Sequence, residues 1–351
     1  METIYKKLAE HLNKLPIPFP STDTGVELKI LEQWFTLQEA NIALNMKGYP
    51  EPVSKIAKRL DMTENELAPV LMEMSKKGLL FRISKNGPLY AIVPLAEGMW
   101  EFHVNSINKK NIANLHEYID FFMENSWYST QTTQHRVIPI SKSISTDMEI
   151  YSYDQAEEII KSQSIISVAD CICRKEHEMI GQGCTHPKEV CMAFGTGAHY
   201  YIENGLGREV IQKEALEILN MAMDAGLVLQ PGNGQKVWSM CMCCSCACYL
   251  LKSLRKMDAP AKVVHTNFFA KIDGDNCTIC GACEEICPMD AITIEDTAKI
   301  LPERCIGCGV CTGACEFDAI SVHQKQKNNQ YLPPKDMVHM QMEIAKERGL
   351  M

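Results

Sequence analysis

The chain has 351 residues, with 35 basic against 44 acidic side chains and 46% apolar residues. This length predicts two or three domains, and the composition is that of a globular protein. No run reaches the roughly 18 apolar residues of a membrane-spanning helix, and the start lacks the apolar core of a secretory signal. We therefore expect a soluble, cytoplasmic protein without a membrane span. The net charge of −9 disfavours nucleic acid as a partner.

The cysteines are the unusual feature of the composition. There are 17 of them, and all lie between Cys171 and Cys315. Disulfide scaffolds are short and secreted, so this pattern favours a reduced chain that binds metal. The expected fold class is α+β with several domains. The predicted segments are an N-terminal helix with a proline-rich linker (1–26), a small module of helices and a hairpin (27–95), a mainly helical connection (96–165), a cysteine-rich metal domain (166–265), a domain with a repeated cysteine pattern (266–323), and a linker with a C-terminal helix (324–351).

The first predicted helices follow from apolar spacing. Ile4, Leu8 and Leu12 share one face of an opening helix, and the proline-rich stretch after it forces an extended connection. The next apolar stripe predicts one longer helix, and it consists of Leu28, Leu31, Trp34, Phe35 and Leu44.

A helix, turn, helix and hairpin pattern follows. A short helix is expected over 52–60, and a second one begins after Thr63, where Glu66 completes a capping box. That helix ends at Gly78. Two strand-like runs, 79–83 and 89–93, flank a turn over 84–88. The arrangement resembles a winged helix-turn-helix.

Charge argues against DNA binding by this module. The second helix carries Glu64, Glu66 and Glu73, and acidic residues repel the phosphates that supply nonspecific affinity. Basic residues on the preceding helix, such as Lys55 and Lys58, keep DNA binding open as the alternative. A docking or structural module is the favoured interpretation.

The connection over 96–165 is expected to be helical over 107–125 and 154–161, with an extended stretch over 137–140. Three histidines fall in this segment: His103, His116 and His135. They lack partners at ligand spacing, so we expect them to be solvated or structural.

The strongest signal is a repeat near the C-terminus. The first copy has Cys277, Cys280, Cys283 and Cys287 at the spacing Cys-x-x-Cys-x-x-Cys-x-x-x-Cys. The second copy has Cys305, Cys308, Cys311 and Cys315 at the same spacing, and both copies continue into Asp-Ala-Ile. Gly281 and Gly309 allow close approach of the backbone.

This repeat closely resembles the two-cluster bacterial ferredoxins. In that family the fourth cysteine of each run binds the other cluster. The resemblance implies one 4Fe–4S cluster on Cys277, Cys280, Cys283 and Cys315, and a second on Cys305, Cys308, Cys311 and Cys287. The second run has Glu316 where the family has proline, as Pro288 does in the first. Zinc ribbons are disfavoured because they use two separated Cys-x-x-Cys knuckles.

The other nine cysteines form two fields. The first field is Cys171, Cys173, Cys184 and Cys191, and the second is Cys241, Cys243, Cys244, Cys246 and Cys248. Residues 167–173 suit a strand that places Cys171 and Cys173 on one face, and Arg174 follows directly, where it favours thiolates. A helix is expected over 208–225, between the two fields.

Three interpretations of these nine thiols remain open: one or two further iron–sulfur clusters, a zinc or mixed-metal site, and free or redox-active thiols. In the simplest partition the first field holds one cluster and the second field holds another. Of the nearby histidines His177, His186 and His199, His186 is best placed to replace a cysteine ligand. The pattern resembles that of multidomain iron–sulfur proteins with a fused ferredoxin module.

The ferredoxin resemblance implies one-electron transfer between redox partner proteins. The favoured hypothesis is an electron-transfer component of an oxidoreductase, docked through its N-terminal module or through a C-terminal helix over 334–348. Two alternatives are a reductase with a substrate-accessible metal site in 171–248 and a redox-sensing winged-helix regulator. No catalytic residue can be identified from the sequence.

Overall fold

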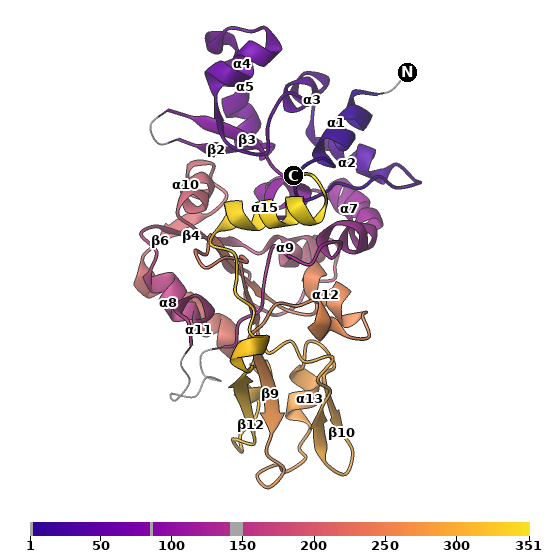
Figure 1. The fold of residues 1–351 in the computed structure, drawn as a ribbon, viewed down its shortest axis with the longest axis vertical. Coiled ribbons are helices and arrows are strands. Elements are labelled where there is room, and N and C mark those ends of the chain that lie inside the picture. The colour runs from indigo at the N-terminus through magenta and orange to yellow at the C-terminus, as the bar shows by residue number, and fades with distance from the viewer. Residues whose placement is uncertain (1–2, 85–86, 141–149) are drawn as a thin grey trace.

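The computed structural model describes residues 3–84, 87–140 and 150–351. Its architecture is α+β, with several small sheets and short helices around them. Figure 1 shows the N-terminal helices at one end of the long axis, a larger sheet in the middle and the segment with β9, β10 and β12 at the other end. Within the described residues, no helix has the length and apolar character needed to cross a membrane.

The opening helix is confirmed as α1 (Ile4–Leu12), but the prediction of one long helix after it is wrong. The chain forms two helices there, α2 (Val26–Trp34) and α3 (Leu37–Ala43). Phe35 is extended between them, and Thr36 then caps α3 in a capping box with Glu39. The break arises because the side chains of Thr36 and Glu39 accept hydrogen bonds from each other's backbone N–H groups, which a continuous helix would bond internally.

The next helices begin where the sequence predicts. They are α4 (Val53–Leu60) and α5 (Glu64–Lys76), and both bonds of the Thr63–Glu66 capping box are present. Gly78, which follows the C-cap of α5, has φ +85° and ends the helical stretch. A three-stranded antiparallel sheet follows in the order β1-β3-β2, and its strands are β1 (Glu51–Pro52), β2 (Leu80–Ile83) and β3 (Leu89–Ile92). Residues 85 and 86 of the predicted turn lie outside the described residues. The winged-helix resemblance of this unit stays a prediction.

The described part of the connecting segment contains several short helical elements, although Ala96, Glu97 and Gly98 within η1 have non-helical φ and ψ. Its elements are η1 (Leu95–Met99), α6 (Trp100–Phe102), α7 (Lys109–Phe122), η2 (Met123–Trp127), η4 (Ser152–Asp154) and α8 (Ala156–Lys161). The predicted extended stretch over 137–140 joins two parts of the molecule. The amide of Ile138 donates to the carbonyl of Leu229 at 3.2 Å, and that of Ile140 donates to the carbonyl of Cys308 at 3.0 Å.

A five-stranded antiparallel sheet in the order β6-β4-β5-β8-β7 forms the centre. Its strands are β4 (Ile166–Asp170), β5 (Glu189–Phe194), β6 (Arg208–Val210), β7 (Val228–Pro231) and β8 (Ser239–Cys243). The helices of this region are α9 (Ile172–Met179), α10 (Thr196–Glu203), α11 (Gln212–Asp224) and α12 (Tyr249–Arg255).

Two expectations for this region need correction. The predicted strand over 167–173 ends at Asp170, and Cys171 is instead the N-cap of α9, with Cys173 in its first turn. The helix expected over 208–225 begins only at Gln212. The residues before it, Arg208–Val210, form the edge strand β6, which pairs with β4, because sheet packing buries Val210 there.

The C-terminal segment has two small antiparallel sheets, β12 with β9 and β10 with β11. Its elements are η5 (Pro260–Lys262), β9 (Phe268–Ile272), α13 (Ala282–Ile286), β10 (Ile292–Ile294), β11 (Ala298–Ile300), α14 (Val310–Gly313), β12 (Ile320–Gln324) and η6 (Lys327–Asn329). The last helix, α15 (Met337–Glu347), runs back to the N-terminal helices (Figure 1). Arg348 then donates to the carbonyl of Asn13 at 2.9 Å, which ties the two ends of the chain together.

Candidate metal centres

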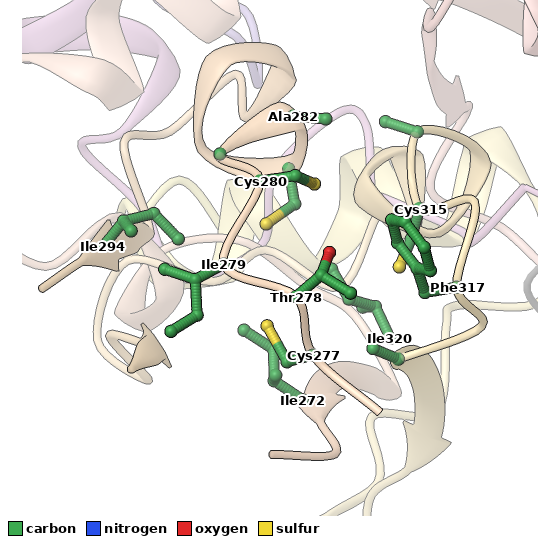
Figure 2. A pocket seen from close by; sticks show the side chains of 14 residues that line it. Ile272, Cys277, Thr278, Ile279, Cys280, Ala282, Ile294, Cys315, Phe317 and Ile320 are labelled. Atoms are coloured by element: carbon green, nitrogen blue, oxygen red, sulfur yellow. The ribbon is translucent and has the colours of Figure 1, made fainter. Parts of the chain in front are cut away.

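The eight cysteines of the repeat surround two cavities. The first is lined by Cys277, Cys280, Cys283 and Cys315 (Figure 2). The second is lined by Cys287, Cys305, Cys308 and Cys311. The structure thus brings together the same two sets of four thiols that the ferredoxin resemblance implied, each with one cysteine from the other run.

The backbone repeats as closely as the sequence does. Gly281 and Gly309 are both left-handed, with φ of +83° and +72°. Ile279 and Gly307 occupy equivalent positions one residue before Cys280 and Cys308, and they have φ of +58° and +67°. A Cβ on Gly307 would lie only 2.3 Å from the carbonyl oxygen of Phe268. These left-handed residues let each Cys-x-x-Cys loop turn tightly enough for successive thiols to face one cavity.

The cysteines of the first cavity, which we call the outer cavity, are more exposed than those of the second, which we call the inner cavity. At the first, Cys280 is exposed, and so are the apolar side chains of Ile279 and Phe317, with 42% and 47% of their surface accessible. At the second, Cys308 and Cys311 are each 8% exposed. Burial raises the pKa of the Cys308 thiol to about 12. A buried thiol of this kind becomes a thiolate when a metal replaces its proton, which suits a cluster ligand.

The comparison with known families agrees with this geometry. Residues 276–319 match the family described as the 4Fe-4S dicluster domain. This segment is a 4Fe-4S dicluster domain. It holds two 4Fe–4S clusters, which supply one-electron transfer when bound. No curated protein and no solved structure matches the chain. Glu316, the departure from the repeat, is exposed, whereas Pro288 is buried.

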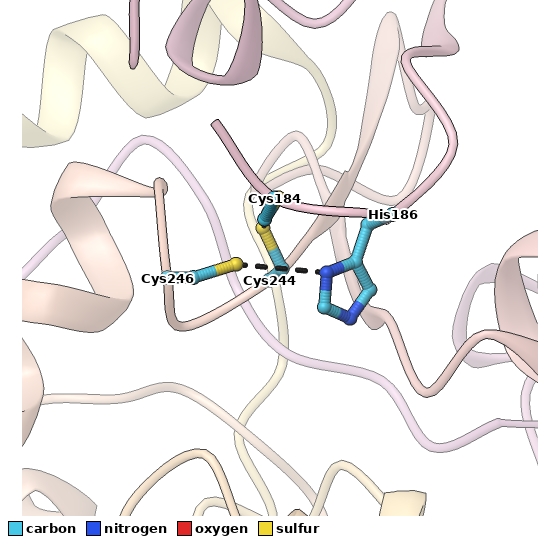
Figure 3. A group of neighbouring side chains, drawn as sticks. All are labelled: Cys184, His186, Cys244 and Cys246. Atoms are coloured by element: carbon cyan, nitrogen blue, oxygen red, sulfur yellow. Dashed lines mark hydrogen bonds between the residues drawn. The ribbon is translucent and has the colours of Figure 1, made fainter. Parts of the chain in front are cut away.

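The nine central cysteines divide differently from the simplest sequence partition. Cys184 of the first field lies with Cys244 and Cys246 of the second, and His186 completes this group (Figure 3). We call these four residues the compact group. Their ligand atoms all lie within 4.8 Å of one another. The structure thus places Cys184 beside cysteines of the second field, across the partition by sequence position.

The physical reason is the antiparallel pairing of β5 with β8. Met192 pairs with Met240 and Ala193 with Ser239, so the end of β8 lies beside the start of β5. Residues that directly follow β8 consequently meet the loop that precedes β5. The prediction that His186 is the histidine best placed to replace a cysteine agrees with this geometry.

The remaining six cysteines form a series of neighbouring thiols, which we call the six-thiol group. Its members are Cys171, Cys173, Cys191, Cys241, Cys243 and Cys248. Hydrogen bonds from Cys241 and Cys248 lower the pKa of Cys243 well below its ordinary value. The hydrogen bond with Cys173 lowers the pKa of Cys171. Cys171 and Cys243 are thus favoured as thiolates, and the thiolate is the form that binds metal.

Arg174 lies between the two central groups. It is 2% exposed, and one of its terminal nitrogens, Nη2, donates to the carbonyl of Met242. Its Nε and Nη1 have no hydrogen-bond partner among the described residues, and it joins no carboxylate ion pair there. Burial opposes its charge, but thiolates of both groups, Cys171 and Cys244 among them, raise its pKa. A buried guanidinium needs anionic neighbours, and metal-bound thiolates provide them.

A buried hydrogen-bonded network beside α9 was missed by the sequence analysis. Glu176 is fully buried, and its Oε1 lies 2.9 Å from His177 Nδ1 and 3.4 Å from His116 Nε2. The hydroxyl of Tyr249 donates to the same oxygen. Lys252 Nζ lies 3.3 Å from His177 Nε2, so a cation already occupies that side of the ring. The lysine makes this network a poor metal site, and no motif in the sequence marks it.

Two histidines of the connecting segment, His103 and His135, are held in structural contacts. His103 is buried, stacks on Trp34 with ring centroids 4.4 Å apart, and is bonded to the carbonyl of Met99. His135 is buried and pairs with Glu97. His199, by contrast, is exposed and belongs to neither central group.

Proposed function

We propose that this chain is an electron-transfer component of an oxidoreductase that relays single electrons between redox partner proteins. The two clusters of the dicluster domain and a third iron–sulfur cluster on the six-thiol group form the relay. The observation that carries the proposal is one continuous apolar core, which contains Cys243 and Cys248 of the six-thiol group together with Cys308 of the inner cavity. Clusters at these two sites would therefore be connected through packed protein.

The exposure of the cavities supports the outer cavity as the place where a redox partner approaches. Cys280 is exposed at the outer cavity, so a partner can approach that cluster closely. Cys308 and Cys311 of the inner cavity are buried, and the Ile140 amide ties Cys308 to the segment that also bonds to β7. Three exposed glutamates lie near the cysteines of the outer cavity. Glu284 and Glu285 are on α13, and Glu316 directly follows Cys315. A redox protein with a basic face would be steered towards them.

The N-terminal unit supports docking or structural roles better than DNA reading. The Tyr200 hydroxyl on α10 lies 2.9 Å from the carbonyls of both Ser75 and Leu80. Arg82 pairs with Glu203 at 3.0 Å. These contacts fasten the unit to the central sheet region, and the acidic residues of α5 are exposed on it. Both features favour a fixed structural module.

One observation favours a reductase as the second candidate. The six-thiol group has two thiols more than the four that a 4Fe–4S cluster binds. Spare thiols beside a cluster would suit a site where substrate meets electrons. In that case the spectrum of the reduced protein should respond to cyanide or carbon monoxide, whereas a pure carrier should not respond.

The test of the relay is the iron content of the full chain after anaerobic reconstitution, combined with EPR of the reduced protein. We expect about 12 irons per chain, against about 8 for the dicluster domain alone. Replacing Cys171, Cys243 and Cys248 together by serine leaves fewer than the four thiols that a cluster needs, and it should lower iron by about four per chain and leave the dicluster EPR signals intact. Wild-type protein with about 8 irons would reject the third cluster.

A further inference from the structure

The compact group has the dimensions of a site for a single ion. Cys184 Sγ and Cys244 Sγ lie 3.9 Å apart, and Cys246 Sγ and His186 Nδ1 lie 3.6 Å apart (Figure 3). A tetrahedral zinc ion with bonds of about 2.3 Å to sulfur and about 2.05 Å to nitrogen requires separations of about 3.8 Å and about 3.6 Å. The observed separations agree with both values.

An iron–sulfur cubane does not fit the same four residues. In a cubane each thiolate binds a different iron, so the ligand sulfurs are held apart by the cluster between them. The dicluster cysteines provide the internal comparison. Among the described residues, no group of three or more ligand atoms within 4.8 Å includes a cysteine of that domain. Sites for cubanes are thus wider than the compact group within this one structure.

We propose that Cys184, His186, Cys244 and Cys246 bind one zinc ion in a closed tetrahedral site that is separate from the iron–sulfur clusters. Thiolate and imidazole are the ligands that zinc prefers, and four protein ligands leave no open position. The site would be structural. It would fasten the loop before β5 to the loop after β8.

The charge of the site also fits its surroundings. Zinc with three thiolates and a neutral imidazole carries a net charge of −1. The buried guanidinium of Arg174, which has no carboxylate partner among the described residues, lies where it can balance that charge. Cys246 is exposed and Cys184 is half-buried, so zinc can enter from the surface.

The first measurement uses the full-length wild-type chain, purified without oxygen from cells supplied with both iron and zinc. We expect one zinc per chain and a zinc-edge X-ray absorption spectrum with three sulfurs at about 2.3 Å and one nitrogen at about 2.0–2.1 Å. The zinc content is measured separately from the iron content. An iron content of about 8 per chain would therefore overturn the proposed third cluster and leave the zinc site standing.

The second measurement compares one variant of the compact group with two control variants. Cys246→Ala should lose most of its zinc on dialysis against a chelator and keep its iron, whereas Cys308→Ala, at a dicluster cavity with only four thiols, should keep zinc and lose iron. His199→Ala should keep both metals. The inference is overturned if wild-type protein holds no zinc and Cys246→Ala loses about four irons, which would assign a cluster to the compact group. A zinc spectrum without sulfur neighbours would also overturn it.

Discussion

A buried ion pair within the connecting segment, between His135 and Glu97, makes stability depend on pH. His135 is 6% exposed, and its Nε2 lies 2.5 Å from Glu97 Oε1. Its Nδ1 lies 3.0 Å from the carbonyl oxygen of Gln230 on β7. Burial alone would lower the pKa of His135, but the Glu97 carboxylate outweighs it and raises the pKa from 6.5 to about 9. His135 is therefore positively charged at neutral pH.

This shift determines the sign and size of the effect. The folded protein binds the proton more tightly than the unfolded chain, so the pair contributes fully below pH 6.5 and its contribution is lost as pH rises towards 9. A rise from 6.5 to about 9 corresponds to about 3 kcal/mol of unfolding free energy. About 2 kcal/mol of this should disappear between about pH 7 and about pH 9.

The assay is urea unfolding of the metal-replete protein under anaerobic conditions, followed by tryptophan fluorescence at several pH values. His135→Gln should be less stable than wild type at pH 7, and the difference should shrink by about 2 kcal/mol towards pH 9. His103→Gln is the matched control. Burial lowers the pKa of His103, so its contribution is lost only as pH falls, and this variant should parallel wild type above pH 7. If His135→Gln also parallels wild type there, the reasoning is refuted.

Three further predictions concern separate parts of the molecule. Arg174→Met should lower the midpoint potential of the central cluster by about 60 mV or more, since a buried positive charge favours the reduced state, while Arg174→Lys should change it less. EPR-monitored redox titration measures this, and equal potentials in all three proteins would contradict it. Gly307→Ala forces a Cβ against the Phe268 carbonyl at left-handed φ and should cost about 2 kcal/mol or more, with loss of inner-cluster iron. Gly274→Ala, which meets nothing within 4 Å, should behave as wild type in the same iron and thermal unfolding assays. Thr36→Ala removes the cap of α3 and should lower the unfolding free energy by about 1 kcal/mol in urea; an unchanged midpoint would argue against the cap as the cause of the helix break.

Features that depend on neighbours in the sequence could be predicted. The capping box at Thr63 fixes the start of α5 because its two bonds join residues three positions apart. The repeated Cys-x-x-Cys loops turn within a few residues, so their spacing is enough to indicate cluster ligands. Residues 276–319 match the dicluster domain in agreement with that spacing. The crossing of Cys287 and Cys315 between runs came from the ferredoxin resemblance.

Features that depend on packing between distant segments could not be predicted. The sequence places Cys184 nearest to Cys191, but the pairing of β5 with β8 places it beside Cys244 and Cys246. Alternation of side chains suggested a strand through Cys173, yet the chain turns into α9 at Cys171. The sequence by itself determined that this protein binds iron–sulfur clusters, because ligand spacing is a local property. Only the tertiary structure decided how the nine central thiols divide, because strand pairing brings together residues that are remote along the chain.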